Sequence, residues 1–410
     1  MMADTKNTKV LYNTEIPSDW EVKELWEIGE LKNGINKEKE DFGFGFPMVN
    51  LMDVFGINKV YKDNFQLGLV NATERDIKEY SLQKGDVLFI RSSVKPEGVG
   101  LTTVICDDLE NTTYSGFIIR FRDNGCLDLE YKAHCFFEEG FRRRLLNKST
   151  ISANTNINQG ALNSLTIPLP PLPEQKAIAQ VLSTSDAAIQ RTEKLIAQKE
   201  LRKKWLMQQL LTGKKRLKGF EGEWKEMHLS EMFTERNETK YFDLPLLSIG
   251  QNGVYPQDES IKKDTSNDDK SKYKRICPGD IGYNTMRMWQ GRSALSDLEG
   301  IVSPAYTVVT PKKNADSLFF SYLFKMPKMT NLFWRNSQGL VDDTLNCKFK
   351  DFSIVKVVLP TTKEEQTAIA QVLQAADKEI SLLKAKAEKL RELKKGLMQV
   401  LLTGKIRFKL

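Results

Sequence analysis

Two polar loops have side chains of the types that form hydrogen bonds with base edges. Each loop follows a glycine-aspartate pair and an apolar run, which begins at Val87 in the first half and at Ile281 in the second. Arginine and lysine suit guanine, and asparagine and glutamine suit adenine, when a rigid support presents them. The candidate residues are Arg91, Ser92, Ser93 and Lys95 in the first loop, and Asn284, Arg287, Trp289, Gln290 and Arg292 in the second. We predict base or phosphate contacts from these loops, with phosphate contacts favoured for the arginines.

A further polar segment, later in the first half, joins this candidate set. It contains Asn154, Asn156, Asn158 and Gln159, and Gln338 is its counterpart in the second half. Asparagine-rich loops are also ordinary turn material. Base contact and turn formation therefore both stay open for these residues.

The chain has few residues for acid-base, metal or phosphoryl chemistry. Its only histidines are His134 and His228, and its five cysteines show no paired spacing that would indicate disulfides or a zinc site. No glycine loop ending in Gly-Lys-Ser/Thr and no Asn-Pro-Pro-aromatic segment occurs. Glu238, Lys240 and Asp243 superficially resemble a nuclease cluster, but such charged groups are common on surfaces. We expect no catalytic residue, no metal and no cofactor in this chain.

Composition permits contact with nucleic acid without proving it. Lysine and arginine number 61 against 54 aspartates and glutamates, a net charge of +7 over 410 residues. The runs Arg142–Arg144 and Lys214–Arg216 suit phosphates, although helix ends are basic as often. No apolar run approaches the ~18 residues of a membrane span, so we expect a cytoplasmic protein with no membrane partner.

The elements that must position these loops are marked by an internal repeat. Residues 174–213 match residues 365–404 at 19 of 40 positions, and each copy closes on Leu-Leu-Thr-Gly. This period is far longer than that of solenoid repeats, so it indicates two whole units joined in tandem.

Both repeated segments have the spacing of a heptad seam, which predicts two long helices that pack on each other. The predicted packing residues are Ile178, Leu182, Ile189, Ile196, Leu206 and Leu210 in the first copy, and Ile369, Leu373, Ile380, Leu383, Leu390, Leu397 and Leu401 in the second. Forty helical residues span about 60 Å, which is too long for one small domain. The alternative is that each is a core helix of its own domain.

The regions before the two helices are rich in short apolar runs separated by glycine, asparagine and proline, as expected for strands. We therefore predict a mixed α/β (α+β) fold with two strand-rich domains and two antiparallel coiled-coil helices, arranged with pseudo-two-fold symmetry. The predicted domains are 1–173, 174–213 (first helix), 214–364 and 365–410 (second helix).

In combination, three stretches carry a family resemblance over nearly the whole chain. They are Ile167–Gln175, which leads into a helix, Leu210–Arg216, and Gly222–Trp224, which opens the second half. With these stretches the chain resembles the specificity subunit of type I restriction-modification systems. One departure is that Val358–Gln366 lacks the proline-rich pattern of Pro170–Pro173, which puts the chain path into the second helix in doubt.

The resemblance implies a non-catalytic subunit with two target-recognition domains. Each domain would read one half of a split sequence in double-stranded DNA, and the two helices would hold the domains apart. It also implies two methyltransferase subunits, which use S-adenosylmethionine, and two restriction subunits driven by ATP and Mg²⁺.

Two rival interpretations stay open at this point. One is a freestanding DNA-binding or scaffold protein that pairs with another chain through its coiled coil. The other is an enzyme with an unrecognised site, either a methyltransferase or a nuclease.

Overall fold

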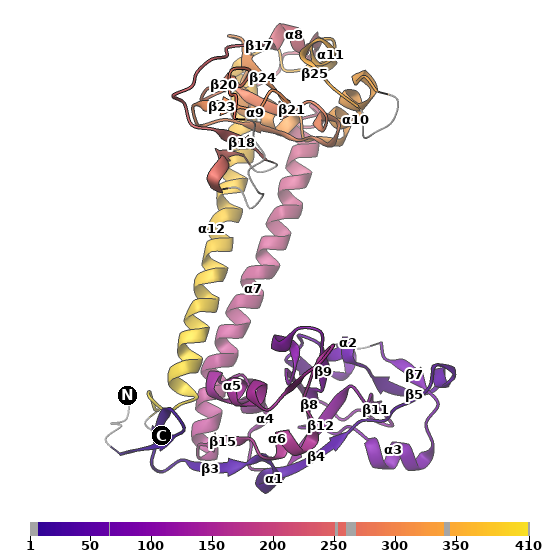
Figure 1. Ribbon diagram of the computed structural model, residues 1–410. Coiled ribbons are helices and arrows are strands. Elements are labelled where there is room, and N and C mark those ends of the chain that lie inside the picture. Colours follow the sequence, from indigo (N-terminus) through magenta and orange to yellow (C-terminus); the bar gives the residue numbers. More distant parts are fainter. Residues whose placement is uncertain (1–6, 65, 251–252, 260–267, 340–344, 409–410) are drawn as a thin grey trace. The chain divides into compact units, whose positions relative to one another are not determined.

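The protein folds as two compact units. The computed structural model describes residues 7–64, 66–250, 253–259, 268–339 and 345–408. Unit 1 comprises residues 1–192 and 386–410, and unit 2 comprises residues 193–385. Two long helices, α7 (Leu172–Leu210) and α12 (Lys363–Leu401), each contribute one segment to each unit (Figure 1). Unit 1 is therefore built from two segments of the chain that are far apart in sequence.

A five-stranded sheet with the strand order β4-β12-β8-β10-β6 lies at the centre of unit 1. Its pairs are antiparallel except for β10 and β6. The strands are β1 (Thr8–Leu11), β2 (Thr14–Pro17), β3 (Glu21–Glu24), β4 (Gly29–Asn33), β5 (Phe42–Val49), β6 (Lys59–Val60), β7 (Gly68–Val70), β8 (Val87–Ile90), β9 (Ser92–Ser93), β10 (Thr102–Ile105), β11 (Thr113–Tyr114), β12 (Ile118–Asp123), β13 (Thr150–Ile151), β14 (Thr155–Asn156) and β15 (Thr166–Leu169). The short helices are α1 (Leu25–Ile28), α2 (Leu51–Val54), α3 (Glu74–Tyr80), α4 (Leu129–Cys135), α5 (Glu139–Asn147) and α6 (Gln159–Asn163).

Unit 2 repeats this plan in a four-stranded sheet with the order β17-β24-β21-β22. The strands are β16 (Lys225–His228), β17 (Phe233–Glu235), β18 (Leu247–Ile249), β19 (Val254–Pro256), β20 (Lys274–Ile276), β21 (Ile281–Asn284), β22 (Ser293–Leu295), β23 (Gly300–Val302), β24 (Tyr306–Pro311) and β25 (Lys356–Leu359). The short helices are α8 (Leu229–Met232), α9 (Ser317–Leu323), α10 (Pro327–Asn336) and α11 (Phe349–Ser353). In their order across the sheet, β17, β24, β21 and β22 correspond to β4, β12, β8 and β10. The mixed α/β fold predicted from the sequence is confirmed.

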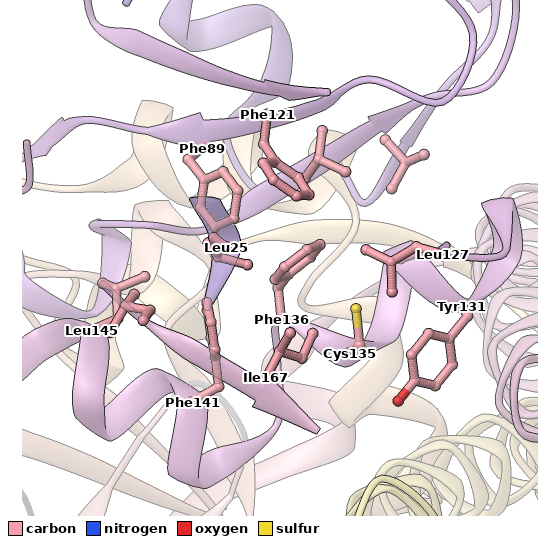
Figure 2. Close-up of a cluster of buried hydrophobic side chains, with 14 of the residues drawn as sticks. Leu25, Phe89, Phe121, Leu127, Tyr131, Cys135, Phe136, Phe141, Leu145 and Ile167 are labelled. Atoms are coloured by element: carbon pink, nitrogen blue, oxygen red, sulfur yellow. The ribbon is translucent and has the colours of Figure 1, made fainter. Parts of the chain in front are cut away.

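Aromatic rings fill the core of unit 1 between its sheet and helices α4 and α5. Phe136 contacts Phe89, Phe121 and Phe141 edge-to-face, with centroid distances of 5.1, 6.1 and 5.5 Å (Figure 2). Edge-to-face contacts of this kind add to the hydrophobic stabilisation of a core. The core extends onto the long helices, because Ile178 and other apolar residues from α7 and α12 belong to the same cluster.

In each unit the segments of α7 and α12 run antiparallel and are joined by ion pairs. Lys394 of α12 binds Asp186 of α7 at 2.6 Å in unit 1. In unit 2 the roles are exchanged, and Lys203 of α7 binds Asp377 of α12. Lys203 lies after Asp186 along α7, whereas its partner Asp377 lies before Lys394 along α12. This opposite order is what an antiparallel pair requires.

The predicted packing residues fall into two groups by burial. Ile178, Leu182, Ile189, Leu210, Ile369, Leu373, Ile380 and Leu401 are buried. Ile196, Leu206, Leu383, Leu390 and Leu397 are half-buried. Ile178, Leu182 and Leu401 are part of the unit 1 core, and Leu210, Ile369 and Leu373 are part of the unit 2 core. The ends of the helices therefore serve the globular cores as well as the helix pair.

Both long helices end with a glycine in the left-handed conformation. Gly213 has φ +71° and Gly404 has φ +68°. Two residues after each glycine the backbone turns back: the Lys215 N–H donates to the Gln209 carbonyl, and the Ile406 N–H donates to the Val400 carbonyl, both at 3.1 Å. Such C-caps satisfy carbonyls at the helix end, so the Leu-Leu-Thr-Gly signal marks the two termini as expected.

A buried glutamate at the start of each long helix anchors an arginine and a tryptophan. Glu174 accepts hydrogen bonds from Trp20 at 3.0 Å and from Arg407 at 2.9 and 2.7 Å. In unit 2, Glu365 accepts hydrogen bonds from Arg216 at 2.5 and 2.7 Å and from Trp224 at 3.3 Å.

The next residue in each repeat, a buried glutamine, ties the long helix to the short helix that covers the sheet. Gln175 accepts from the Asp128 N–H at 2.8 Å, and Asp128 is the N-cap of α4. Gln366 accepts from the Asp316 N–H at 2.9 Å, and Asp316 is the N-cap of α9. Both helices thus start with the same contacts, although the proline-rich pattern is absent before the second.

No helix within the described ranges combines the length and the apolar character needed to cross a membrane.

Candidate nucleic-acid interface

The first candidate loop begins from a turn held by a buried carboxylate. Gly85 has φ +92°, a conformation that glycine adopts without strain. Asp86 accepts from the Gln83 N–H at 2.8 Å and from two nitrogens of Arg122, each at 2.7 Å. These hydrogen bonds raise the pKa of Arg122. These hydrogen bonds fix the turn before strand β8. The candidate loop that follows β8 therefore starts from a rigid support.

The second candidate loop begins in the same way. Gly279 has φ +91°. Asp280 accepts from the Cys277 N–H at 2.8 Å and from Arg236 Nε at 2.7 Å. The hydrogen bond with Asp280 raises the pKa of Arg236.

In unit 1 the structure brings the two predicted groups together. Ser92 of β9 pairs with Asn156 of β14, and the strand β13 continues this small antiparallel sheet. The Ile157 N–H also donates to the Arg91 carbonyl at 3.0 Å. Side chains from the loop after β8 and from the Asn154–Gln159 segment therefore lie side by side.

Unit 2 repeats this arrangement. The Cys347 N–H donates to the Thr285 carbonyl at 2.8 Å, as Ile157 does to Arg91. Asn346 pairs with Gln338 through two backbone hydrogen bonds of 2.8 and 2.9 Å. The loop after β21 and the segment around Gln338 are thus brought to one place.

The candidate side chains differ in how far they reach solvent. Lys95, Asn154, Asn158, Gln290, Arg292 and Gln338 are exposed. Arg91, Ser92, Ser93, Asn156, Gln159, Asn284, Arg287 and Trp289 are half-buried. DNA contact by all of them stays a prediction, and the exposed group is the better placed for it.

Several candidates also hold the local backbone. Asn158 caps α6 by accepting from the Ala161 N–H at 2.8 Å, and Gln159 donates to the Leu31 carbonyl. Asn284 accepts from the Met286 N–H at 2.9 Å. The turn-forming interpretation therefore applies to these amides, and a base contact would have to come from their remaining groups.

Other half-buried candidates donate to backbone carbonyls. Arg91 Nη1 donates to Gly116 at 3.1 Å, and Trp289 Nε1 donates to Met286 at 3.0 Å. These contacts fix the two side chains in position. Prior ordering of a side chain lowers the entropic cost of a later contact with a ligand.

Sequence reasoning missed three exposed apolar residues beside the first loop. Val94 is 81% exposed, Ile151 is 79% exposed and Phe117 is 59% exposed. Val94 lies between Ser93 and Lys95 in the sequence, which was the available signal. Apolar side chains at this edge are suited to thymine methyl groups.

The arginine run in α5 serves the fold. Arg142 donates to the carbonyls of Glu97 and Val99 at 3.0 and 2.7 Å, and Arg144 donates to that of Thr166 at 3.2 Å. Burial lowers the pKa of both arginines. Arg216 is likewise committed to Glu365. We therefore do not assign these three arginines to phosphate contact.

Comparison with known proteins identifies the family. The model described as the type I restriction modification DNA specificity domain matches residues 17–200 and again residues 221–392. The chain belongs to this family. It is a specificity subunit with one specificity domain in each half, a DNA-recognition component of a restriction-modification complex and not one of its catalytic subunits.

Individual relatives are specificity subunits as well, one of them matching over nearly the whole length of this chain. A protein described as the MjaX specificity subunit of Methanocaldococcus jannaschii is 29% identical, covering 96% of this chain and 95% of that protein. The EcoKI specificity subunit of Escherichia coli K12 is 26% identical over 48% of this chain and 41% of its own length. The rival interpretations as a freestanding scaffold or an enzyme are not favoured.

Solved structures share the fold of the specificity subunit. The S subunit of M. genitalium superimposes with a TM-score of 0.54 at 14% identity, covering 96% of this chain and 98% of that one. A chain from a study of complex assembly and conformational transition in a type I system gives a TM-score of 0.59 at 15% identity, covering 95% and 99%.

Proposed function

We propose that each unit reads one half of a bipartite target in double-stranded DNA. In this proposal residues 1–173 and 214–364 are the target-recognition domains, and residues 174–213 and 365–410 are the spacer helices. The loop after β8 and the segment Asn154–Gln159 read one half-site. The loop after β21 and the segment at Gln338 read the other.

The observation that carries this proposal is a common framework with different side chains at the candidate sites. Gln175 and Gln366 make the same backbone contacts in the two units. By contrast, the N-cap of α6 is Asn158 and the N-cap of the corresponding α11 is Lys348. Different side chains on equivalent supports are what two different half-sites require.

We further propose that α7 and α12 set the spacing between the half-sites. Each is a continuous helix of 39 residues. At about 1.5 Å per residue such a helix keeps a fixed length. Antiparallel packing with ion pairs such as Lys394–Asp186 opposes sliding of one helix along the other.

The proposed assembly contains two methyltransferase subunits and two restriction subunits. In this assembly S-adenosylmethionine, ATP and Mg²⁺ belong to those partners, and this chain contributes recognition only. The solved chain cited above comes from a study of the assembly of such a system. Cellular DNA is the target, so we place the complex in the cytoplasm.

Domain exchange tests the proposal. Residues 214–364 are replaced by the corresponding segment of a relative with another target, and the chain is co-expressed with its methyltransferase partner. Mapping of methylated adenines should show that one half of the target changes and the other half stays. The matched exchange of residues 1–173 should change the opposite half. A change of both halves in either exchange would contradict modular reading.

A further inference from the structure

A groove of about 510 Å³ lies in unit 2 beside the second candidate loop. Its walls come from strands β17 and β20, from the turn after β21, from the turn before β24 and from the start of α11. The lining residues Thr285 and Met286 belong to the candidate loop, and Asn346 pairs with Gln338. The groove therefore adjoins both parts of unit 2 that we predict to contact DNA, the loop after β21 and the segment at Gln338.

The groove carries positive charge. Lys274, Lys348 and Lys350 line it together with one acidic residue, Glu235. Lys274 is paired with Glu235 at 3.2 Å. Lys348 and Lys350 are exposed, and among the described residues no carboxylate is recorded within ion-pair distance of either. Two ammonium groups on one wall are an attractive site for phosphate.

Asn346 has a buried acceptor next to the same groove. Asn346 lines it, and its side-chain Oδ1 is buried without a hydrogen-bond partner among the described residues. Leaving a buried acceptor unsatisfied costs free energy. An asparagine amide can offer both an acceptor and a donor to the N6 and N7 atoms of adenine. Turning of the Asn346 amide toward the groove would let a base edge satisfy the group that the described residues leave without a partner.

The backbone around Asn346 is fixed. Asp351 is buried, accepts from the Lys348 N–H at 3.1 Å and accepts from Gln338 Nε2 at 3.4 Å. Burial raises the pKa of the neighbouring Cys347 thiol to about 12, so this thiol stays neutral. Lys348 starts α11, whose Phe349 ring stacks on Phe352 at 6.1 Å. The two lysines and the amide are thus presented from an ordered segment.

The equivalent place in unit 1 has different chemistry. The α6 N-cap is Asn158, and Gly160 stands where unit 2 has Lys350. Gln159 donates to the Leu31 carbonyl and so closes against the sheet. Neither lysine has a counterpart there, which is consistent with a groove that serves the target half of unit 2 alone.

We propose that this groove holds a strand of the DNA half-site read by unit 2. Lys348 and Lys350 bind adjacent backbone phosphates, and Asn346 makes a sequence-dependent contact with the edge of one base, preferably adenine. Met286, which is 44% exposed at the same groove, supplies apolar contact. The inference rests on the proposed function, since it presupposes that unit 2 reads DNA.

The lysine part is tested by DNA binding of the full complex over a range of salt concentrations. Each of Lys348→Gln and Lys350→Gln should weaken binding of all sequences alike and lower the slope of log K against log[salt] by about one. Lys348→Arg and Lys350→Arg should retain the slope. Lys225→Gln and Lys313→Gln are matched controls, because both lysines are exposed in unit 2 and line no part of the groove.

The amide part is tested by methylation mapping. Asn346→Ala and Asn346→Asp should relax or change one position in the unit 2 half-site and leave the other half-site unchanged. Thermal unfolding of each variant shows whether the fold is intact. Asn346→Ser, which keeps a smaller polar group, provides a second variant if the alanine protein does not fold.

The outcomes separate the inference from the proposed function. If the wild-type complex binds and methylates a bipartite site but the glutamine variants keep its salt slope and the Asn346 variants keep its target, the groove assignment is wrong. If the wild-type complex shows no sequence-dependent binding, the proposed function itself fails.

Discussion

Glu174 and Arg407 are joined by two hydrogen bonds of 2.9 and 2.7 Å, although 233 positions separate them in the sequence. Arg407 binds Asp19 as well, and the hydrogen bond with Glu174 is the main cause of its raised pKa. This contact fixes the residues after α12 to the start of α7 within unit 1. The equivalent contact in unit 2 is that of Arg216 with Glu365.

Replacing Arg407 by methionine should destabilise unit 1 by about 3 kcal/mol, because the buried Glu174 carboxylate loses its charge partner. Chemical denaturation with hydrogen exchange resolved along the chain measures the effect in each unit. Arg216→Met should act on unit 2 instead, and Glu174→Gln combined with Arg407→Met should recover part of the loss. An Arg407→Met protein as stable as the wild type would contradict this account.

His134 should make unit 1 less stable as the pH falls. Burial, followed by Lys394 and Lys59, lowers the pKa of His134 from 6.5 to about 3 in the folded protein. Its neighbours include Ser183 at 3.2 Å and Asp186 at 4.0 Å. Below pH 6.5 the unfolded chain takes up a proton that the folded protein does not, so stability is lost.

The loss attributable to His134 at pH 5 is about 2 kcal/mol relative to pH 7.5 or above. His134→Gln should remove most of the pH dependence between pH 7 and pH 5. The pKa of Glu130 is also lowered from 4.5. This carboxylate therefore changes stability only below about pH 4.5, outside the interval between pH 7 and pH 5. An equal slope for the variant and the wild type in urea denaturation would exclude His134 as the source.

The two helix-ending glycines should differ in their tolerance of alanine. Each has a positive φ, so alanine costs about 1 kcal/mol in backbone strain at either place. A Cβ on Gly404 would lie 2.4 Å from Pro17, whereas one on Gly213 would lie 3.3 Å from Trp224. Gly404→Ala should therefore lower the unfolding temperature more than Gly213→Ala, and the reverse order would show that Pro17 yields easily.

Removing one heptad from each long helix, in register, should shorten the accepted spacer between half-sites. Seven residues correspond to about 10 Å of helix, or about three base pairs. Both half-sites should stay as they are, since neither reading loop is altered. Methylation mapping checks the result, and unchanged spacing would show that the helices do not set the distance.

The long helices were predictable because their apolar spacing is regular and their sequence is repeated. The caps at Gly213 and Gly404 were predictable as well, because glycine is the residue that most readily adopts the left-handed conformation found there. The roles of Gln175 and Gln366 were not predictable. Nothing in a sequence specifies which distant backbone atoms a buried amide will bind.

The candidate site was predicted in part. The loop after β21 and Gln338 were both identified, but only the fold shows that Asn346 lies between them. Lys348 and Lys350 are more than sixty positions from Asn284 and have no local pattern that distinguishes them from other surface lysines. Proximity created by tertiary folding leaves no periodic signal along the chain.

The split composition of unit 1 has a consequence for how the protein is made. Residues 193–385 are contiguous, so unit 2 has all its parts as soon as they leave the ribosome. Unit 1 contains residues synthesised before unit 2, yet Leu401, Leu402 and Arg407, synthesised after unit 2, complete its core and its ion pair with Glu174. The unit that is begun before the other is therefore finished after it, once all of unit 2 has been translated.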